Sequence, residues 1–145
     1  GWGRGERLLA LPSLQSRPML VVPPPAPVRT ADAYAWLDKD RGAEHTGEWA
    51  SVLPPSAFAS WDEVRKLAHN DFEPAVAGRL PEIGHWLDRL RATSAFLVAL
   101  AGSGGAMAAL YQTAAQRDAA WQRLGADPAI LRCETMEAGA GLTEE

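Results

Sequence analysis

The sequence predicts an α+β fold in which helices pack on one face of an antiparallel sheet. In the stretch AFLVALAGSGGAMAALY, residues 95–111, two apolar runs flank Gly102-Ser103-Gly104-Gly105, as two strands joined by a tight turn do. Two more β-type runs, at 19–22 and 130–136, are separated from this pair by segments with helical periodicity. Hairpin strands mixed with crossover helices are typical of a sheet covered by helices on one side.

The composition indicates a single globular domain. The chain has 145 residues, of which 47% are hydrophobic and 22% charged, as in proteins that bury a core. The net charge is -4 and the cations are scattered, so we expect no binding to nucleic acid. No apolar run approaches the roughly 18 residues of a membrane-spanning helix. We therefore expect a cytoplasmic protein that does not enter a membrane.

The first elements are predicted to be a strand and a helix joined by a stiff loop. The run MLVV at 19–22 is apolar and rich in β-formers. The proline-rich stretch 23–27 ends the strand, because proline fixes φ and has no N–H for the ladder. Thr30 is then predicted to cap a helix from Ala31 to about Asp38.

The middle of the chain predicts a loop and two helices. Residues 39–57 are polar and aperiodic, which indicates a long surface loop. Ser60 with Glu63 makes a capping box for a helix over 61–69 that ends near Asn70. Pro81 suits the first residue of the next helix. The apolar residues of that helix follow the i, i+3, i+4, i+7 spacing: Ile83, Trp86, Leu87 and Leu90.

The last elements follow the hairpin. Thr113 with Gln116 predicts a capped helix that reaches about Leu124. Gly125 ends this helix, and residues 130–136 form the final strand. The single cysteine, Cys133, has apolar neighbours in this strand, which favours a buried thiol over a reactive one.

The glycine stretch is the strongest functional candidate that the residues offer by themselves. Glycine reaches positive φ without a Cβ clash, which both a tight hairpin turn and an anion-binding nest of backbone amides require. From the local sequence, Gly102 to Gly105 is therefore either a plain turn or an anion-binding loop.

Other chemistry is not supported by the residue patterns. The three histidines, His45, His69 and His85, have no ligands at a recognisable spacing, so we expect no metal site. Neither a nucleophile elbow nor a P-loop motif occurs. The six tryptophans are scattered, which indicates packing and not a platform for nucleic-acid bases.

Three segments, in order, resemble one kinase family. LVVPPPAPVRTADAYAWLD, NDFEPAVAGRLPEI and ALAGSGGAMAALY are similar to the carboxy-terminal half of 4-diphosphocytidyl-2-C-methyl-D-erythritol kinases, which belong to the GHMP kinase superfamily. The third segment resembles the glycine-rich third motif of that superfamily. The second resembles the Asn-Asp-x-Glu-Pro helix start of these kinases. The opening GWGRGERL resembles their passage out of an amino-terminal domain.

The resemblance implies a fold, an activity and a site. It implies a GHMP kinase carboxy-terminal domain of ferredoxin-like fold at 19–138, preceded at 1–18 by the end of a missing amino-terminal ATP-binding domain and followed at 139–145 by a flexible tail. The family transfers the γ-phosphoryl of ATP, with Mg, to its cytidyl-methylerythritol substrate in the non-mevalonate route to isoprenoid precursors.

The resemblance also assigns residues. It implies that the loop of Gly102, Ser103, Gly104 and Gly105 closes over the phosphate or substrate. Asn70 and Asp71 match paired residues of the family, either as helix caps or as active-site support, and Thr30 matches a further position. No catalytic residue of the family matches this chain. The chain alone is therefore expected to be inactive.

Two departures and two alternatives accompany this interpretation. Ala26 stands where the family often has an aromatic residue that stacks on cytosine, and the ATP loop, the catalytic Lys and the catalytic Asp are absent. One alternative is a non-catalytic module of the same fold that binds an anion or a partner. The other is a different GHMP kinase of the homoserine or mevalonate type.

Overall fold

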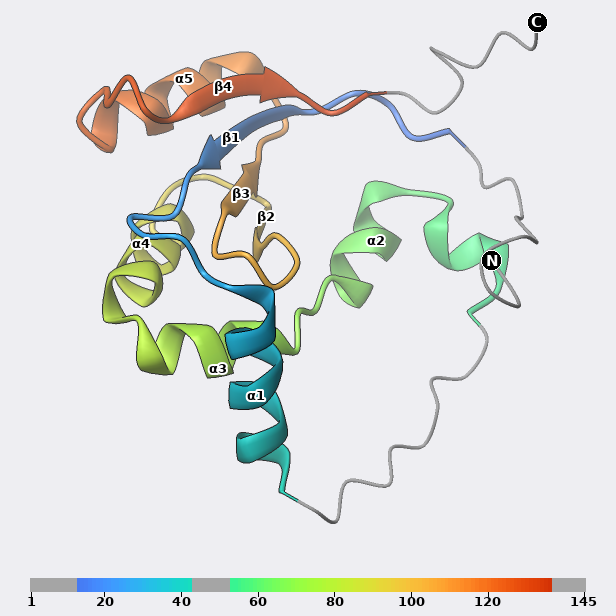
Figure 1. The fold of residues 1–145 in the computed structure, drawn as a ribbon. Coiled ribbons are helices and arrows are strands. Elements are labelled where there is room, and N and C mark those ends of the chain that lie inside the picture. The colour runs from blue at the N-terminus through green and yellow to red at the C-terminus, as the bar shows by residue number, and fades with distance from the viewer. Residues whose placement is uncertain (1–12, 43–52, 137–145) are drawn as a thin grey trace, which may run out of the picture.

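The computed structural model describes residues 13–42 and 53–136, and it confirms the α+β fold (Figure 1). Four strands form one sheet with the order β2-β3-β1-β4, in which every neighbouring pair is antiparallel. The strands are β1 (Pro18–Val22), β2 (Leu97–Leu100), β3 (Met107–Leu110) and β4 (Leu131–Glu134). This strand order is that of the ferredoxin-like βαββαβ unit.

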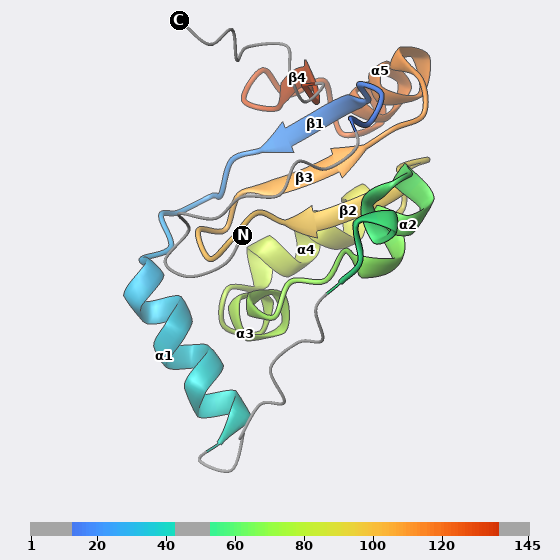
Figure 2. The same ribbon diagram turned by 90° about the vertical axis from the view of Figure 1, so that its right-hand side faces the viewer.

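Two helices cover one face of the sheet, as the sequence predicts. The helix α4 (Pro81–Arg91) precedes β2, and α5 (Ala114–Arg123) leads from β3 to β4 (Figure 2). Alternate residues of β1 point to these helices because side chains along a strand alternate between faces. The buried residues form one core cluster, which includes Leu20, Val22, Ile83, Leu87, Leu90, Met107, Ala109, Tyr111 and Ala120.

The local signals of these two helices are confirmed. Pro81 is the first residue of α4, and the predicted apolar stripe is buried except for Trp86, which is half-buried. Thr113 accepts a hydrogen bond from the Gln116 backbone N–H, and the Gln116 side chain accepts one from the Thr113 N–H, so the capping box is complete. Gly125, with φ +95°, follows the helix end.

Three further helices lie between β1 and α4: α1 (Thr30–Arg41), α2 (Trp61–Leu67) and α3 (Phe72–Arg79). The helix α3 has no counterpart among the elements predicted from local patterns. Pro74 lies in its first turn, and the helix is held by tertiary packing of Ala75 and Val76, which are buried. The predicted end of the preceding helix near Asn70 is also wrong, because α2 stops at Leu67.

The loop prediction and the cap prediction for Thr30 need correction. Residues 39–41 continue α1 and Pro55–Phe58 form a short 3-10 helix, while residues 43–52 lie outside the described residues. Thr30 is the first residue of α1, and the N-cap position belongs to Arg29, whose side chain makes no capping bond. Arg29 is extended, with ψ 128°, so the helix starts one residue earlier than the threonine pattern predicts.

The aromatic residues and the cysteine lie around the core. Four tryptophans are half-buried, which supports packing; Trp2 and Trp49 lie outside the described residues, and the four are Trp36, Trp61, Trp86 and Trp121. Cys133 is half-buried on β4, an edge strand, and is therefore not the core thiol that the sequence predicts. Within the described ranges, no helix is long and apolar enough to span a bilayer.

The segment before β1 is tied to the end of β4. The Ser16 hydroxyl donates to the Thr135 backbone oxygen at 2.6 Å, and the Arg17 N–H donates to the Thr135 hydroxyl at 2.8 Å. The Thr135 N–H donates in turn to the Arg17 oxygen at 2.9 Å.

The division of the chain into residues 1–18, 19–138 and 139–145 stays a prediction.

Candidate functional site

The glycine loop, residues 101–106, packs against the proline-rich loop that follows β1. A Cβ built on Gly105 would lie 2.7 Å from Val28 Cγ2, 3.0 Å from Ile83 Cδ1 and 3.2 Å from Pro24 Cβ. The first of these separations is closer than real Cβ contacts allow, and Gly105 also has φ +81°. Glycine at 105 is therefore required by both space and backbone conformation.

The rest of the loop presents free backbone donors. The Ala101 N–H donates to the Ala106 oxygen at 2.7 Å and closes the hairpin. Among the described residues, the N–H groups at 102–105 have no backbone or side-chain acceptor. Gly102 has φ +61°, and nothing lies within 4 Å of a Cβ built on Gly104. Consecutive free N–H groups on a turn with left-handed residues form a concave site for an anion.

Asn70 holds the glycine loop in place. Its Nδ2 donates to the Leu100 oxygen at 2.7 Å and to the Gly102 oxygen at 2.8 Å. Its Oδ1 accepts from the Phe72 N–H at 2.9 Å, where α3 begins. One side chain therefore bonds both to the first turn of α3 and to the glycine loop, while its support of an active site stays a prediction.

Thr30 reaches the same loop, whereas Asp71 does not. The Ser103 hydroxyl donates to the Thr30 hydroxyl at 3.3 Å, a contact that spans most of the chain between β1 and β3. The Asp71 carboxylate pairs with Arg41 of α1 and with His69 Nε2 at 3.0 Å. Asp71 makes no side-chain capping bond, and its ion pair with Arg41 joins α1 to the start of α3.

An apolar hollow adjoins the two loops. A pocket of about 340 Å³ is lined by Pro25, Ala26, Leu80, Pro81, Glu82 and Ile83. Ile83 also lies next to Gly105, with its Cδ1 3.0 Å from a Cβ built there, so this one residue borders both the hollow and the glycine loop. The sequence did not predict this hollow, because its walls come from two segments that are more than 50 residues apart, and of its lining residues only Ala26 was considered as a substrate contact.

The site supplies hydrogen-bond donors and apolar surface but no metal ligands. Among residues 13–42 and 53–136, no three His, Cys, Asp or Glu side chains gather in a way that could hold a metal ion. His45 lies outside those ranges. The arrangement can bind an anionic group through backbone amides and an uncharged group in the hollow.

Comparison with protein families gives one match. A family model described as GHMP kinases C terminal matches residues 56–129, which include α2 through α5 and the glycine loop. The 4-diphosphocytidyl-2-C-methyl-D-erythritol kinase of Novosphingobium aromaticivorans is 36% identical over 122 residues, covering 83% of this chain and 39% of the relative. The kinase of the same name from Nitrobacter hamburgensis is 36% identical over 131 residues, covering 86% of this chain and 43% of the relative.

Two solved structures share the fold. A 4-(cytidine 5'-diphospho)-2C-methyl-D-erythritol kinase aligns with a TM-score of 0.63 at 23% identity, over 91% of this chain and 47% of that one. Mevalonate kinase of L. major, solved with R-mevalonate, aligns with a TM-score of 0.61 at 17% identity, over 88% and 44%. The chain spans about two fifths of the length of the curated relatives it matches.

Proposed function

The chain belongs to the GHMP kinase C-terminal family, and from this premise we propose that it is the substrate-side domain of an ATP-dependent small-molecule kinase. In this proposal the glycine loop binds the phosphate of the substrate or the phosphoryl group in transfer. The observation that carries it is the set of free N–H groups at 102–105, held by Asn70.

The chemistry suits backbone donors. Phosphoryl transfer depends mainly on positioning and on stabilising the charge spread over the transferred group. Fixed N–H donors supply this stabilisation without reorganising during the reaction. The clamp from Asn70 keeps the loop in one conformation before a ligand arrives, and Gly105 lets the loop sit against the proline-rich loop.

The proposed substrate is 4-diphosphocytidyl-2-C-methyl-D-erythritol. Two curated relatives that share 36% of residues with this chain are named as kinases of that compound. Its diphosphate matches the anion-binding loop in charge, and its uncharged parts match the neighbouring apolar hollow. Ala26 lines this hollow and leaves space where a larger residue would fill it.

ATP would supply the phosphoryl group, and an amino-terminal domain would hold it. The described residues offer free donors for a phosphate but no cluster for Mg²⁺, so we assign no residue of this chain to the metal. We also assign no catalytic base to the described residues. The proposal therefore places the reaction between this domain and a second one that carries the nucleotide.

A fusion protein tests the proposal. The chain is joined behind the part of the Novosphingobium aromaticivorans kinase that it does not match, and transfer from ATP to the cytidyl substrate is measured. We expect activity in the fusion and none in the chain alone. Gly104→Val should lower kcat/KM of the fusion about tenfold or more, because a side chain there intrudes on the donors without clashing with the fold.

A matched control separates the site from the fold. Gly78→Val makes the same change at a glycine of α3 that also has nothing within 4 Å of a Cβ, and its kcat/KM should stay within about twofold of the parent. A folded fusion that transfers no phosphoryl group, or a Gly104→Val fusion as active as Gly78→Val, would contradict the proposal.

The second candidate function is a binding module without catalysis. The loop, its Asn70 clamp and the hollow are all complete within this chain, which favours ligand binding that needs no other domain. Calorimetric titration of the isolated chain with the cytidyl substrate tests this alternative. Binding that Gly104→Val removes, together with an inactive fusion, would favour the module.

A further inference from the structure

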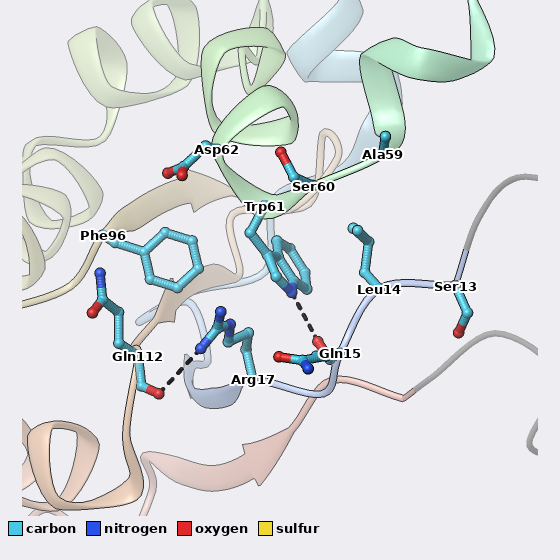
Figure 3. A pocket seen from close by; sticks show the side chains of 10 residues that line it. All are labelled: Ser13, Leu14, Gln15, Arg17, Ala59, Ser60, Trp61, Asp62, Phe96 and Gln112. Atoms are coloured by element: carbon cyan, nitrogen blue, oxygen red, sulfur yellow. Dashed lines mark hydrogen bonds between the residues drawn. The ribbon is translucent and has the colours of Figure 1, made fainter.

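A second pocket lies at the opposite end of the β2–β3 hairpin from the glycine loop. It has a volume of about 380 Å³, within the range of small-molecule sites. Phe96, just before β2, and Gln112, just after β3, form one side, and α2 contributes Trp61 and Asp62 (Figure 3). The segment before β1 closes the other side with Arg17 and its neighbours.

Arg17 is the cationic group that lines this pocket, and most of its donors are unused. Figure 3 shows its guanidinium beside the Phe96 and Trp61 side chains, on the side toward Gln112. Nη1 donates to the Gln112 backbone oxygen at 3.3 Å, and Nε is buried with no acceptor. Within the described part of the chain, no carboxylate lies within ion-pair distance of this guanidinium. A guanidinium carries five N–H donors, so Arg17 retains capacity for an anion.

Two aromatic rings form the apolar walls. The Trp61 and Phe96 ring centroids are 6.0 Å apart, and their planes meet at 73°. The Trp61 Nε1 donates to the Gln15 oxygen at 2.8 Å, which fixes the indole in the wall. The Arg17 guanidinium carbon lies 6.0 Å from the Phe96 centroid, within cation–π range. The rings and the cation therefore present apolar faces beside a positive charge.

We propose that this pocket binds a small planar aromatic molecule that carries a carboxylate. A planar ring suits stacking or edge contacts with Trp61 and Phe96. A carboxylate suits end-on pairing with Nη1 and Nη2 of Arg17, which leaves one Nη1 hydrogen for the Gln112 oxygen. The site is separate from the glycine loop, and the proposal does not depend on the kinase function.

Asp62 allows the sign of the electrostatic effect on ligand binding to be tested. Its exposed carboxylate also lines the pocket, and a negative charge there opposes an anionic ligand. Removing the charge of Asp62 should therefore tighten binding, whereas removing the charge of Arg17 should weaken it. A purely apolar binding site would respond to neither change.

The test is a titration of the 145-residue chain with 2-naphthoate, followed through the Trp61 indole N–H signal in NMR spectra. Trp61→Phe identifies this signal among the six tryptophans. We expect 2-naphthoate to shift it, and the neutral naphthalene-2-carboxamide to bind at least about tenfold more weakly. Asp62→Asn should lower Kd about threefold, and Arg17→Gln should raise it about tenfold.

Further variants keep the result decisive. Arg17→Lys keeps the charge but loses the planar fork, so its Kd should lie between those of the parent and Arg17→Gln, which also covers the case that Arg17→Gln unfolds. Gly104→Val should bind 2-naphthoate like the parent, because the glycine loop is at the other end of the hairpin. The proposal is overturned by equal binding of the carboxamide, by equal binding in Arg17→Lys, or by an unmoved Trp61 signal at millimolar probe. Loss of the shift in the fusion protein would instead assign this pocket to a contact between domains, and would also overturn the proposal.

Discussion

The two ends of the β2–β3 hairpin carry candidate binding sites built on opposite principles. At the glycine loop, the donors are backbone N–H groups and side chains are absent or small. At the other end, Trp61, Phe96 and Arg17 form the pocket with their side chains. Substitutions that add side-chain atoms should therefore disrupt the glycine-loop end. Substitutions that remove side-chain atoms should disrupt the other end.

The difference also determines how each end is held. The glycine loop is fixed from outside by one amide, Asn70, and by contacts with Val28 and Ile83. At the aromatic end, the residues that line the pocket hold one another. The Trp61 Nε1 donates to the Gln15 oxygen, and the Trp61 ring packs edge-on against Phe96. Substitutions at the two ends can test this comparison directly.

The largest effect is expected at Gly105. Gly105→Ala places a Cβ against Val28 Cγ2 at 2.7 Å and forces alanine to φ +81°. We expect a loss of about 2–4 kcal/mol in the free energy of unfolding, measured by urea denaturation. Gly104→Ala meets no atom within 4 Å and should change stability by less than about 0.5 kcal/mol. Equal stability of the two variants would contradict the packing argument.

The second effect concerns the hydrogen bonds by which Asn70 holds the glycine loop. Asn70→Ala removes two donated bonds and one accepted bond, and should cost about 2 kcal/mol by thermal or urea unfolding. Asn70→Asp keeps an acceptor for the Phe72 N–H but sets a carboxylate against the Leu100 and Gly102 oxygens. If Asn70 only started the helix, the Asp variant would be as stable as the parent. We expect it to be at least as unstable as Asn70→Ala.

A smaller effect is expected at the aromatic end. Trp61→Phe keeps an aromatic wall but removes the Nε1 hydrogen bond to the Gln15 oxygen, at a cost of about 1 kcal/mol in urea unfolding. Under the proposed function, the cytidyl substrate should bind this variant like the parent, because the change lies at the opposite end of the hairpin from the glycine loop. If Trp61→Phe lost more free energy of unfolding than Gly105→Ala, the comparison of the two ends would be contradicted.

The smallest effect is a pH dependence at the contact between α1 and α3. The hydrogen bond from Arg79 is the main cause that lowers the pKa of Asp40 below its ordinary 3.8. A lowered carboxyl pKa contributes stability that is present above pH 3.8 and is lost as the pH falls through the folded-state value. Asp40→Asn should therefore have a slightly lower Tm at neutral pH and match the parent at strongly acidic pH. A constant difference from pH 7 down to pH 2 would exclude this cause.

The predictions that were confirmed rest on short-range chemistry. The capping box of Thr113 and Gln116, Pro81 at a helix start and the apolar runs on both sides of the glycine loop each involve residues within a few positions. The start of α3 was indicated by the family resemblance of Asn-Asp-x-Glu-Pro but not by local periodicity, because the helix's own residues give a weak pattern. The helix is held in place by residues from other elements, such as Tyr34, whose ring centroid lies 4.8 Å from that of Phe72.

The residues of the two candidate sites divide in the same way. The glycine stretch was proposed as a site from the sequence, because only glycine combines positive φ with small size. The pocket around Arg17 had no local signal, because its walls come from the chain before β1, from α2 and from the two outer ends of the hairpin strands.

The sequence by itself determined the strands of the hairpin, the capped helix after it and the glycine loop, because these depend on the preferences of adjacent residues. Only the tertiary structure decided what holds the loop. Asn70 is 30 residues before Leu100, and Thr30 is 73 residues before Ser103, yet their side chains meet at that loop. Such contacts form only when the strands assemble into the sheet and bring remote residues together. The conformational preferences of adjacent residues do not specify which remote residues will meet.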